Sequence, residues 1–240
     1  MALEPALAAI RAAIGDPSTA TGPSRQAIDA HVRLLLAWNT AMNLTAITDP
    51  GAVARLHVAD SLSALPVILA GPHASLLDLG SGGGFPGLPL AAALPRTRVG
   101  LLESVGKKAT FLEAAVRAAG LADRVTVLAR RAEAAAPGRW DIVTARAVGA
   151  LPDLVELALP LLGPGGRLVA WKRAMPGAEL AAAGRASAAL GGSVPSFNLL
   201  PARIATAAGL EGHGLAVVTK LRPTPAMFPR DPAARKRTPW

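Results

Sequence analysis

The residues in this sequence whose types and spacing best suit chemistry lie in one glycine-rich stretch, SLLDLGSGGGFPG, at residues 75–87. An apolar run ends there at Asp78, and glycines follow at Gly80, Gly82, Gly84 and Gly87. Glycine has no Cβ, so the backbone can adopt positive φ and approach a ligand closely. Pro86 suits the first turn of a helix, whose free N–H groups favour electron-rich atoms. The stretch therefore predicts a strand, a ligand-binding turn and a helix.

Two cofactors fit this turn. The last three glycines match a GxGxxG spacing, and Glu103 follows about twenty residues later, as in dinucleotide-binding folds. On the other hand, the run from Asp78 reads DLGSGGG, and Phe85 stands where a glycine would complete a GxGxxG begun at Gly80. That loop form is typical of S-adenosylmethionine-dependent methyltransferases. We favour this cofactor, while a nicotinamide-dependent oxidoreductase remains the alternative.

Polar residues at the ends of the next predicted strands complete a site. Glu103 is placed to accept the ribose hydroxyls of an adenosine group, although it could instead cap the helix that begins near Lys107. Ala132 and Glu133 follow the third strand, where backbone groups could read the adenine edge. Arg146 ends the fourth strand, where a methyl donor would meet its acceptor; a solvated arginine is the alternative.

The elements that must position these residues change character near residue 70. Before it, apolar residues at helical spacing predict helices at Pro5–Ile14, at Ser24–Met42 with Ser24 as N-cap, and from Pro50 to Leu65 with Pro66 as the stop. After it, short apolar runs alternate with helical segments, the pattern of βαβ units. We therefore divide the chain into an N-terminal helical appendage (1–70), a cofactor-binding domain (71–221) and a Pro-rich, basic, extended tail (222–240).

The predicted fold is α/β and Rossmann-like, a mostly parallel seven-stranded sheet flanked by helices. The predicted strands are Ser75–Leu79, Arg98–Glu103, Val125–Leu128, Trp140–Ala145, Arg167–Trp171, Gly214–Leu221 and a weaker one within Ser193–Leu200. The predicted helices between them are Pro86–Leu94, Lys107–Ala119, Leu151–Leu161 and Glu179–Leu190.

Composition limits the classes of function. The chain has 240 residues, 51% of them hydrophobic and 17% charged, which suits a globular protein. The absence of cysteine excludes disulfides and thiolate chemistry, and the four histidines show no metal-ligand spacing, so no metal is expected. No apolar run reaches the roughly 18 residues of a membrane span. We expect a cytoplasmic monomer. The net charge of +9 favours a nucleic-acid partner, although a GC-rich coding bias would also enrich arginine.

Several motifs together resemble one known family. They are WNTAMNLTAITDP (38–50), LHVADSL (56–62), LLDLGSGGGFPGLPLA, LLESVGKKATFL, ARRAEA, VTARAV, GGRLVAWK and the final VVTKLRPTPAMFPRDPAARKRTP. Over nearly its full length the chain resembles the RsmG (GidB) family, which methylates N7 of one guanine in bacterial 16S ribosomal RNA of the small subunit. The resemblance implies S-adenosyl-L-methionine as cofactor and this RNA as substrate.

The resemblance also implies roles for individual residues. The cofactor contacts carried over are Gly80, Phe85, Glu103, Ala132, Glu133 and Arg146, to which the loop itself adds Asp78 and Gly82. The positions that would face RNA are Lys107, Lys108, Lys172 and Arg230, to which the charge of the tail adds Arg222. The tail departs from the family at Phe228 and across Asp231–Arg235, which lacks the usual glycine. His57 is a site residue by resemblance, but we interpret it as a core histidine.

The implied chemistry needs no general base. Guanine N7 carries a free lone pair on the major-groove edge, so it can attack a sulfonium methyl without first losing a proton. Alignment of the reactants and exclusion of water would supply about 7–11 kcal/mol of the barrier reduction. We expect Arg146 to orient the base or its phosphate. An RNA-binding assembly factor that has lost catalysis is a further alternative.

Overall fold

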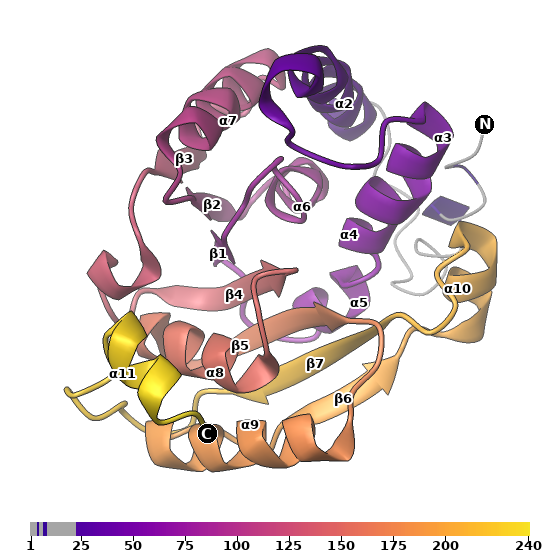
Figure 1. The fold of residues 1–240 in the computed structure, drawn as a ribbon. Helices are drawn as coiled ribbons and strands as arrows, with labels where there is room; N and C mark the ends of the chain where they lie inside the picture. The colour runs from indigo at the N-terminus through magenta and orange to yellow at the C-terminus, as the bar shows by residue number, and fades with distance from the viewer. Residues whose placement is uncertain (1–3, 5–6, 9–22) are drawn as a thin grey trace.

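The centre of the molecule is a single twisted sheet. The structure, a computed structural model, describes residue 4, residues 7–8 and residues 23–240. Its seven strands lie in the order β3-β2-β1-β4-β5-β7-β6 (Figure 1). Their bounds are β1 Ser75–Leu79, β2 Arg98–Leu102, β3 Val125–Leu128, β4 Trp140–Arg146, β5 Leu162–Lys172, β6 Ser196–Leu199 and β7 Gly214–Thr219. β1 to β5 are parallel, and β7 is antiparallel to its neighbours β5 and β6. The predicted mostly parallel, seven-stranded sheet is confirmed.

Helices cover both faces of the sheet. The helices that follow strands are α6 Gly87–Ala93, α7 Gly106–Ala118, α8 Leu151–Ala158, α9 Gly177–Leu190 and α10 Ala202–Ala208. α6 and α7 lie with α2 (Pro23–Met42) on one side of the sheet, and α8 and α9 lie on the other (Figure 1). Each side has its own cluster of buried apolar side chains. Every residue of β1 is buried, which explains why leucines occupy three of its five positions, on both faces of the sheet.

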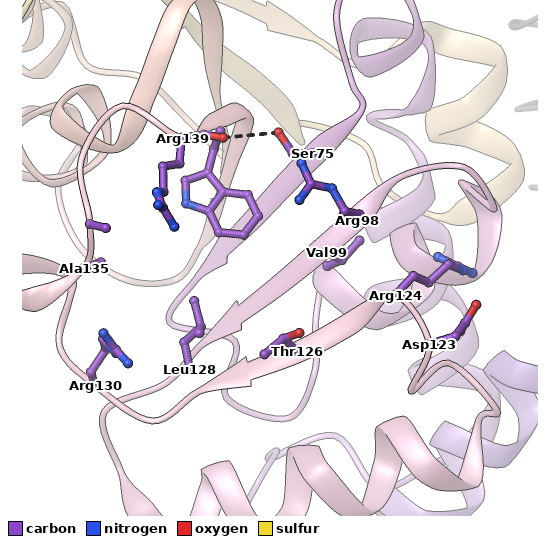
Figure 2. A pocket seen from close by; sticks show the side chains of 12 residues that line it. Ser75, Arg98, Val99, Asp123, Arg124, Thr126, Leu128, Arg130, Ala135 and Arg139 are labelled. Atoms are coloured by element: carbon purple, nitrogen blue, oxygen red, sulfur yellow. Dashed lines mark hydrogen bonds between the residues drawn. The ribbon is translucent and has the colours of Figure 1, made fainter.

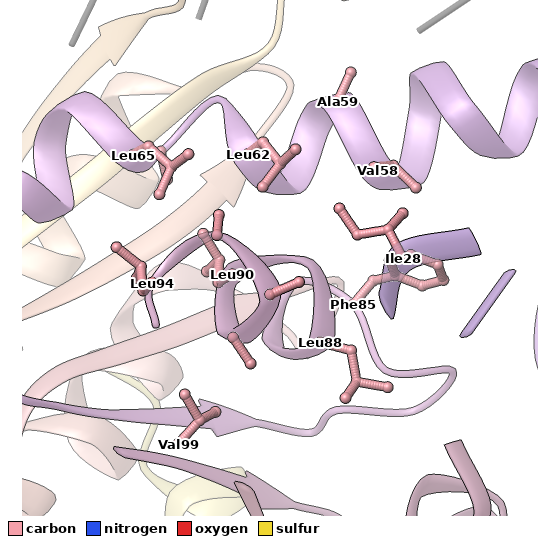
Figure 3. Close-up of a cluster of buried hydrophobic side chains, with 14 of the residues drawn as sticks. Ile28, Val58, Ala59, Leu62, Leu65, Phe85, Leu88, Leu90, Leu94 and Val99 are labelled. Atoms are coloured by element: carbon pink, nitrogen blue, oxygen red, sulfur yellow. The ribbon is translucent and has the colours of Figure 1, made fainter. Parts of the chain in front are cut away.

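The N-terminal helices pack on the sheet domain through α6. Figure 3 shows Val58, Leu62 and Leu65 facing Leu90 and Leu94, and all five are at most 4% exposed. These side chains belong to one cluster with residues of α2 and α7. The predicted appendage therefore shares its core with the sheet domain.

The helix predicted from Pro50 to Leu65 is more divided than expected. It consists of α3 (Pro50–Val53), a π-helical stretch η1 (Ala54–Ala59) and α4 (Asp60–Leu62), followed after two residues by α5 (Leu65–Leu69). Pro66 was predicted to stop the helix, but it lies in the first turn of α5, where a proline has no backbone N–H to leave unpaired. Ser24 is likewise not an N-cap: α2 begins at Pro23, and the Ser24 hydroxyl donates to the Ala92 carbonyl at 2.8 Å. The helix predicted at Pro5–Ile14 lies almost entirely outside the described residues.

The helical region Pro50–Leu69 is also long and apolar enough to cross a membrane by length and composition alone. However, 56% of its apolar window is buried inside the protein. Its packing on α6 accounts for that apolar character.

The sequence predicted an extended tail, but the last residues of the chain are not fully extended. Pro232–Arg237 form α11, and the residue before it, Asp231, accepts the Ala234 N–H with its carboxylate at 2.8 Å. Asp231 is thus a conventional N-cap, followed by a proline at the first helical position. α11 lies beside α8 (Figure 1), so the tail folds back onto the domain.

Candidate active site

The glycine turn after β1 has the backbone geometry that its sequence predicts. Gly80 has a φ of +72°, and a Cβ there would lie 2.9 Å from Val148 Cγ2. Gly84 has a φ of +90°, and a Cβ there would lie 2.7 Å from His31 Nε2. Positive φ and close approach both require glycine at these two positions. The turn leads directly into α6, which begins at Gly87.

Asp78 stabilises this turn through its buried carboxylate. It is fully buried, its Oδ2 accepts the Gly87 N–H at 3.1 Å, and its Oδ1 accepts the Thr144 hydroxyl at 2.9 Å. Burial raises the pKa of the Asp78 carboxyl to about 6, although these hydrogen bonds oppose the shift. Asp78 was predicted as a cofactor-binding residue; its contacts give it the role of fixing the turn and the start of α6.

Glu103 connects the turn to the end of β2. Its Oε2 accepts the Gly82 N–H at 2.9 Å and its Oε1 accepts the Val105 N–H at 2.8 Å, with the residue only 7% exposed. Val105 immediately precedes α7, so Glu103 also accepts a hydrogen bond at the start of this helix, close to the alternative capping role that the sequence suggested. A carboxylate oxygen can accept two hydrogen bonds, which leaves lone pairs of both oxygens for a pair of hydroxyl groups.

A cavity of about 180 Å³ opens at the carboxyl ends of β1 and β2, and we call it the cofactor cavity. It brings together three of the predicted cofactor-binding residues, Gly80, Ala132 and Glu133. Ala132 and Glu133 belong to η2, a 3-10 turn at Ala132–Ala134. In open α/β sheets, this edge is where ligands bind.

The C-terminal tail contributes one wall of the cofactor cavity, which the sequence had not predicted. Arg235 of α11 lines it and pairs with Glu133 Oε1 at 2.5 Å. Because about a hundred residues separate the two, no local pattern signals the contact. Val148, which follows β4, also lines the cavity.

Arg146 lies at the end of β4, as predicted, and it is held by the N-terminal helices. Its Nη1 donates to Asp60 Oδ2 at 3.1 Å and to the Leu56 carbonyl at 3.2 Å, and its Nη2 lies 3.2 Å from His57 Nδ1. Asp60 is 3% exposed, and its Oδ1 is 3.0 Å from His213 Nδ1. The Arg146 guanidinium therefore links β4 to the helical segment that precedes the sheet.

His57 is neutral in this cluster. Burial, and then the charge of Arg146, lower its pKa to about 4. A neutral ring that accepts from Arg146 at Nδ1 must carry its proton at Nε2, which is 2.7 Å from the Thr45 hydroxyl. The ring also stacks on Phe85, with centroids 4.8 Å apart.

Phe85 is enclosed by side chains of the protein on several sides. It is 6% exposed, with His31 on one side at 4.6 Å and Arg146 at 5.4 Å from its ring centroid. This packing joins the turn to α2 and to the Arg146 cluster, and the contact of Phe85 with the cofactor stays a prediction.

A second cavity, of about 360 Å³, lies beside this cluster, and we call it the acceptor cavity. Its lining includes His57, Asp60, Arg146, Trp171, Lys172 and His213. The segment Ala147–Gly149 separates it from the cofactor cavity: Val148 lines one, and its two neighbours line the other. Two cavities that share one short wall suit a donor and an acceptor that must meet.

The residues predicted to face RNA divide into two groups. Lys107 is exposed and Lys108 half-buried at the start of α7, and Arg222 is exposed after β7. Lys172 is at the acceptor cavity, where its Nζ donates to Glu179 Oε1 at 2.7 Å and to the Gly149 carbonyl at 2.9 Å. Lys107, Lys108 and Arg222 remain available for an RNA contact, whereas Lys172 is paired with Glu179 and only 15% of its side chain is exposed.

Arg230 belongs to a structural clamp instead. Its guanidinium pairs with Glu156 Oε2 at 2.6 Å, and the Trp240 indole N–H donates to the same oxygen at 2.6 Å. Although burial alone raises the pKa of Glu156, the hydrogen bonds from Arg230 and Trp240 hold it below its ordinary value. Glu156 is completely buried, so we reassign Arg230 from RNA binding to anchoring the tail.

Sequence reasoning missed three polar residues of the acceptor cavity, Asp60, Arg173 and His213. Asp60 was visible as the one acidic residue within the apolar run LHVADSL, a position where a carboxylate needs a partner. His213 had no comparable signal. Within the described part of the chain, no group of three or more His, Asp or Glu side chains is placed to hold a metal ion.

Comparison with known sequences gives one consistent family. Residues 24–204 match the family described as rRNA small subunit methyltransferase G. The ribosomal RNA small subunit methyltransferase G of Chloroflexus aggregans is 46% identical over 201 residues, which are 82% of each chain. The protein of the same name from Geobacillus kaustophilus is 38% identical and covers 88% of this chain and 89% of its own.

Comparison with solved structures shows the same fold at low identity. An O-methyltransferase from Bacillus cereus in complex with SAH matches with a TM-score of 0.55 at 21% identity, covering 81% of this chain and 91% of that one. The [4+2]-cyclase SpnF matches with a TM-score of 0.52 at 17% identity, covering 68% and 81%. Because proteins with different reactions share this fold, its function must be argued from the site and the family.

Proposed function

The chain belongs to the rRNA small subunit methyltransferase G family, and we propose that it transfers a methyl group from S-adenosylmethionine to N7 of one guanine in 16S ribosomal RNA of the small subunit. The observation that carries the proposal is the pair of cavities that share the Ala147–Gly149 wall. One is bordered by the glycine turn and η2, and the other by the Arg146 cluster.

The residues of the cofactor cavity fit an adenosyl group. Glu103 is not part of the lining itself, but it lies between the lining residues Leu102 and Ser104. Two backbone N–H groups orient its carboxylate, which keeps free lone pairs for the ribose hydroxyls. Gly80 lets the turn approach the ligand without a Cβ, and Ala132 offers backbone groups to the adenine edge. When bound, the cofactor supplies an electrophilic methyl group on a sulfonium sulfur.

The acceptor cavity fits a nucleophile that brings its own lone pair. His57 is neutral and already hydrogen-bonded through both ring nitrogens, and Asp60 is engaged by Arg146 and His213. Neither group is free to remove a proton. Guanine N7 needs no general base, because it carries no proton that must leave before it attacks. The protein's contribution is then to align the base and exclude water, an effect worth about 7–11 kcal/mol.

Arg146 acts in this scheme as a positioning residue. It joins the wall of the acceptor cavity to the N-terminal helices through Asp60 and Leu56. Lys107, Lys108 and Arg222 are the proposed phosphate contacts, and cationic side chains of this kind position RNA without reading its sequence. We further propose that the enzyme acts as a cytoplasmic monomer without a metal ion.

Two measurements test the proposal against its alternatives. Calorimetry with S-adenosylhomocysteine and with NADH, each separately, should give binding of the first only, since a nicotinamide-dependent oxidoreductase would bind the second. Incubation with labelled methyl donor and small subunits should then label 16S RNA. Binding of RNA without any methyl transfer would instead identify an assembly factor.

A further inference from the structure

A large cavity lies beside β3, and Arg130 belongs both to its lining and to the lining of the cofactor cavity. Its volume is about 670 Å³, and it begins near the amino ends of β1, β2 and β3, at Ser75, Arg98 and Asp123. Four arginines line it, Arg98, Arg124, Arg130 and Arg139, so we call it the arginine cavity.

The arginine cavity arises because the connection from β3 to β4 is short. Where a full crossover helix would cover the sheet, the chain has only the three-residue turn η2. Trp140 covers part of the exposed sheet instead: a Cβ on Gly100 of β2 would lie 2.7 Å from the Trp140 ring. Thr126, which pairs with Gly100 in the sheet, remains exposed beside it.

The charge in this cavity is largely uncompensated. Arg124 donates to the Leu94 and Thr97 carbonyls at 3.3 and 3.5 Å, and Asp123 is the one acidic residue in the lining. The side chains of Arg98, Arg130 and Arg139 are exposed and have no hydrogen bond or ion pair within the part of the chain that the structure describes. Figure 2 shows Arg98 and Arg139 near Ser75, and Arg130 beyond Leu128 at the other end of β3. Several unpaired guanidinium groups around one hollow favour a polyanion.

We propose that the arginine cavity binds the phosphate backbone of the ribosomal RNA substrate, outside the nucleotides that enter the acceptor cavity. This inference rests on the proposed function. Arg130 lines both the arginine cavity and the cofactor cavity, so the arginine cavity reaches the edge of the sheet at which the cofactor and acceptor cavities lie. The half-buried Trp140 ring in the lining also offers a surface on which an unpaired base can stack.

A single small phosphate compound fits this arrangement less well. Arg124 and Arg130 flank the two ends of β3, whose four residues span about 13 Å. A ligand that contacts guanidinium groups over such a length must carry several phosphates in a row. An RNA strand has this property, and the net charge of +9 agrees with it.

The test compares two double variants with the same change in charge. Arg98→Gln/Arg139→Gln alters the arginine cavity and leaves Arg130 and the cofactor cavity intact. Arg185→Gln/Arg203→Gln, at exposed positions on α9 and α10, is the matched control. Dissociation constants for free 16S RNA and for small subunits are measured by filter binding over a range of salt concentrations. Thermal unfolding and affinity for S-adenosylhomocysteine verify that both variants are folded.

The cavity variant should bind both free RNA and small subunits about tenfold more weakly than the control, and its salt dependence should be flatter by about 1.5 in log–log slope, since each lost phosphate contact removes roughly 0.7–0.9. Equal binding by the two variants would overturn the proposal. A loss confined to assembled subunits would assign the cavity to a ribosomal protein and also overturn it. If the unaltered protein transferred no methyl group to RNA, the proposed function would fail, whereas this comparison of binding would still report on the cavity.

Discussion

Replacing Arg146 with lysine tests the link between the Arg146 cluster and the reaction. The guanidinium contacts three groups, Asp60, the Leu56 carbonyl and His57, at 3.1 to 3.2 Å. A lysine ammonium can keep the pairing with Asp60 but cannot reach the other two in the same geometry. Loss of two hydrogen bonds from a charged donor, partly replaced by water from the acceptor cavity, should lower the free energy of unfolding by about 3 kcal/mol.

Alanine at this position would give a less informative result. It would leave Asp60, which is 3% exposed, with His213 as its remaining partner. Removal of one member of a buried ion pair costs about 3–5 kcal/mol. Since whole domains are stable by about 5–15 kcal/mol, that variant could be partly unfolded, and lost activity would say nothing about the reaction.

The assay therefore combines three readings on Arg146→Lys: urea unfolding, calorimetry with S-adenosylhomocysteine, and single-turnover methyl transfer. Because Arg146 lines only the acceptor cavity, cofactor affinity should stay within about twofold, a change of roughly 0.4 kcal/mol, while turnover falls at least tenfold. Arg203→Lys, exposed on α10, is the control and should change none of the three. The reasoning is refuted if the variant unfolds as easily as expected but keeps its turnover, or if cofactor affinity falls in parallel with turnover.

Three further predictions concern other parts of the site. Glu103→Gln should weaken S-adenosylhomocysteine binding at least tenfold, since it replaces a charged acceptor by an amide whose NH₂ group faces a backbone N–H; calorimetry measures it. His31→Gln should make the free energy of unfolding less sensitive to acid, because burial lowers the pKa of His31 to about 4 and the unfolded state alone binds the extra proton between pH 6.5 and 4. The wild type should therefore lose about 2 kcal/mol of stability from this group between pH 7 and pH 5. Urea unfolding at both pH values measures this loss. Glu156→Gln should lower the free energy of unfolding by about 3 kcal/mol, because it breaks the buried pair with Arg230, and chemical denaturation would show this.

Each of these predictions has a contradicting outcome. Glu113→Gln, at an exposed position on α7, is the control for the cofactor measurement, and equal affinity of the two variants would remove Glu103 from the site. If the free energy of unfolding fell equally on acidification in the wild type and in His31→Gln, the His31 ring would not be the group responsible for the loss. Unchanged stability of Glu156→Gln would mean that the tail clamp adds nothing to folding.

Patterns local in sequence predicted the sheet and the turn. β1 was predicted with its observed bounds because a short segment with three leucines follows a Gly-Pro pair and leads into a glycine turn. The residues Gly80, Ala132 and Glu133 were predicted correctly to gather at one edge, since the carboxyl ends of parallel strands meet there.

The remaining features depend on contacts that no local pattern encodes. Pro66 is compatible with the end or the beginning of a helix, and only packing on α6 decides between them. The basic tail suggested RNA binding, but the buried carboxylate of Glu156 is the partner of Arg230. Phe85 was predicted as a ligand contact, and its packing against His31 and His57 had no signal in the sequence.

The central claim is methyl transfer to one guanine, and mapping the product tests it most directly. The protein is incubated with labelled methyl donor and small subunits, and the labelled nucleotide is then located in 16S RNA by digestion and mass spectrometry. The account predicts a single labelled guanine that carries the methyl group at N7. Label on another atom, on ribosomal protein or on many nucleotides, or no label at all, would contradict it.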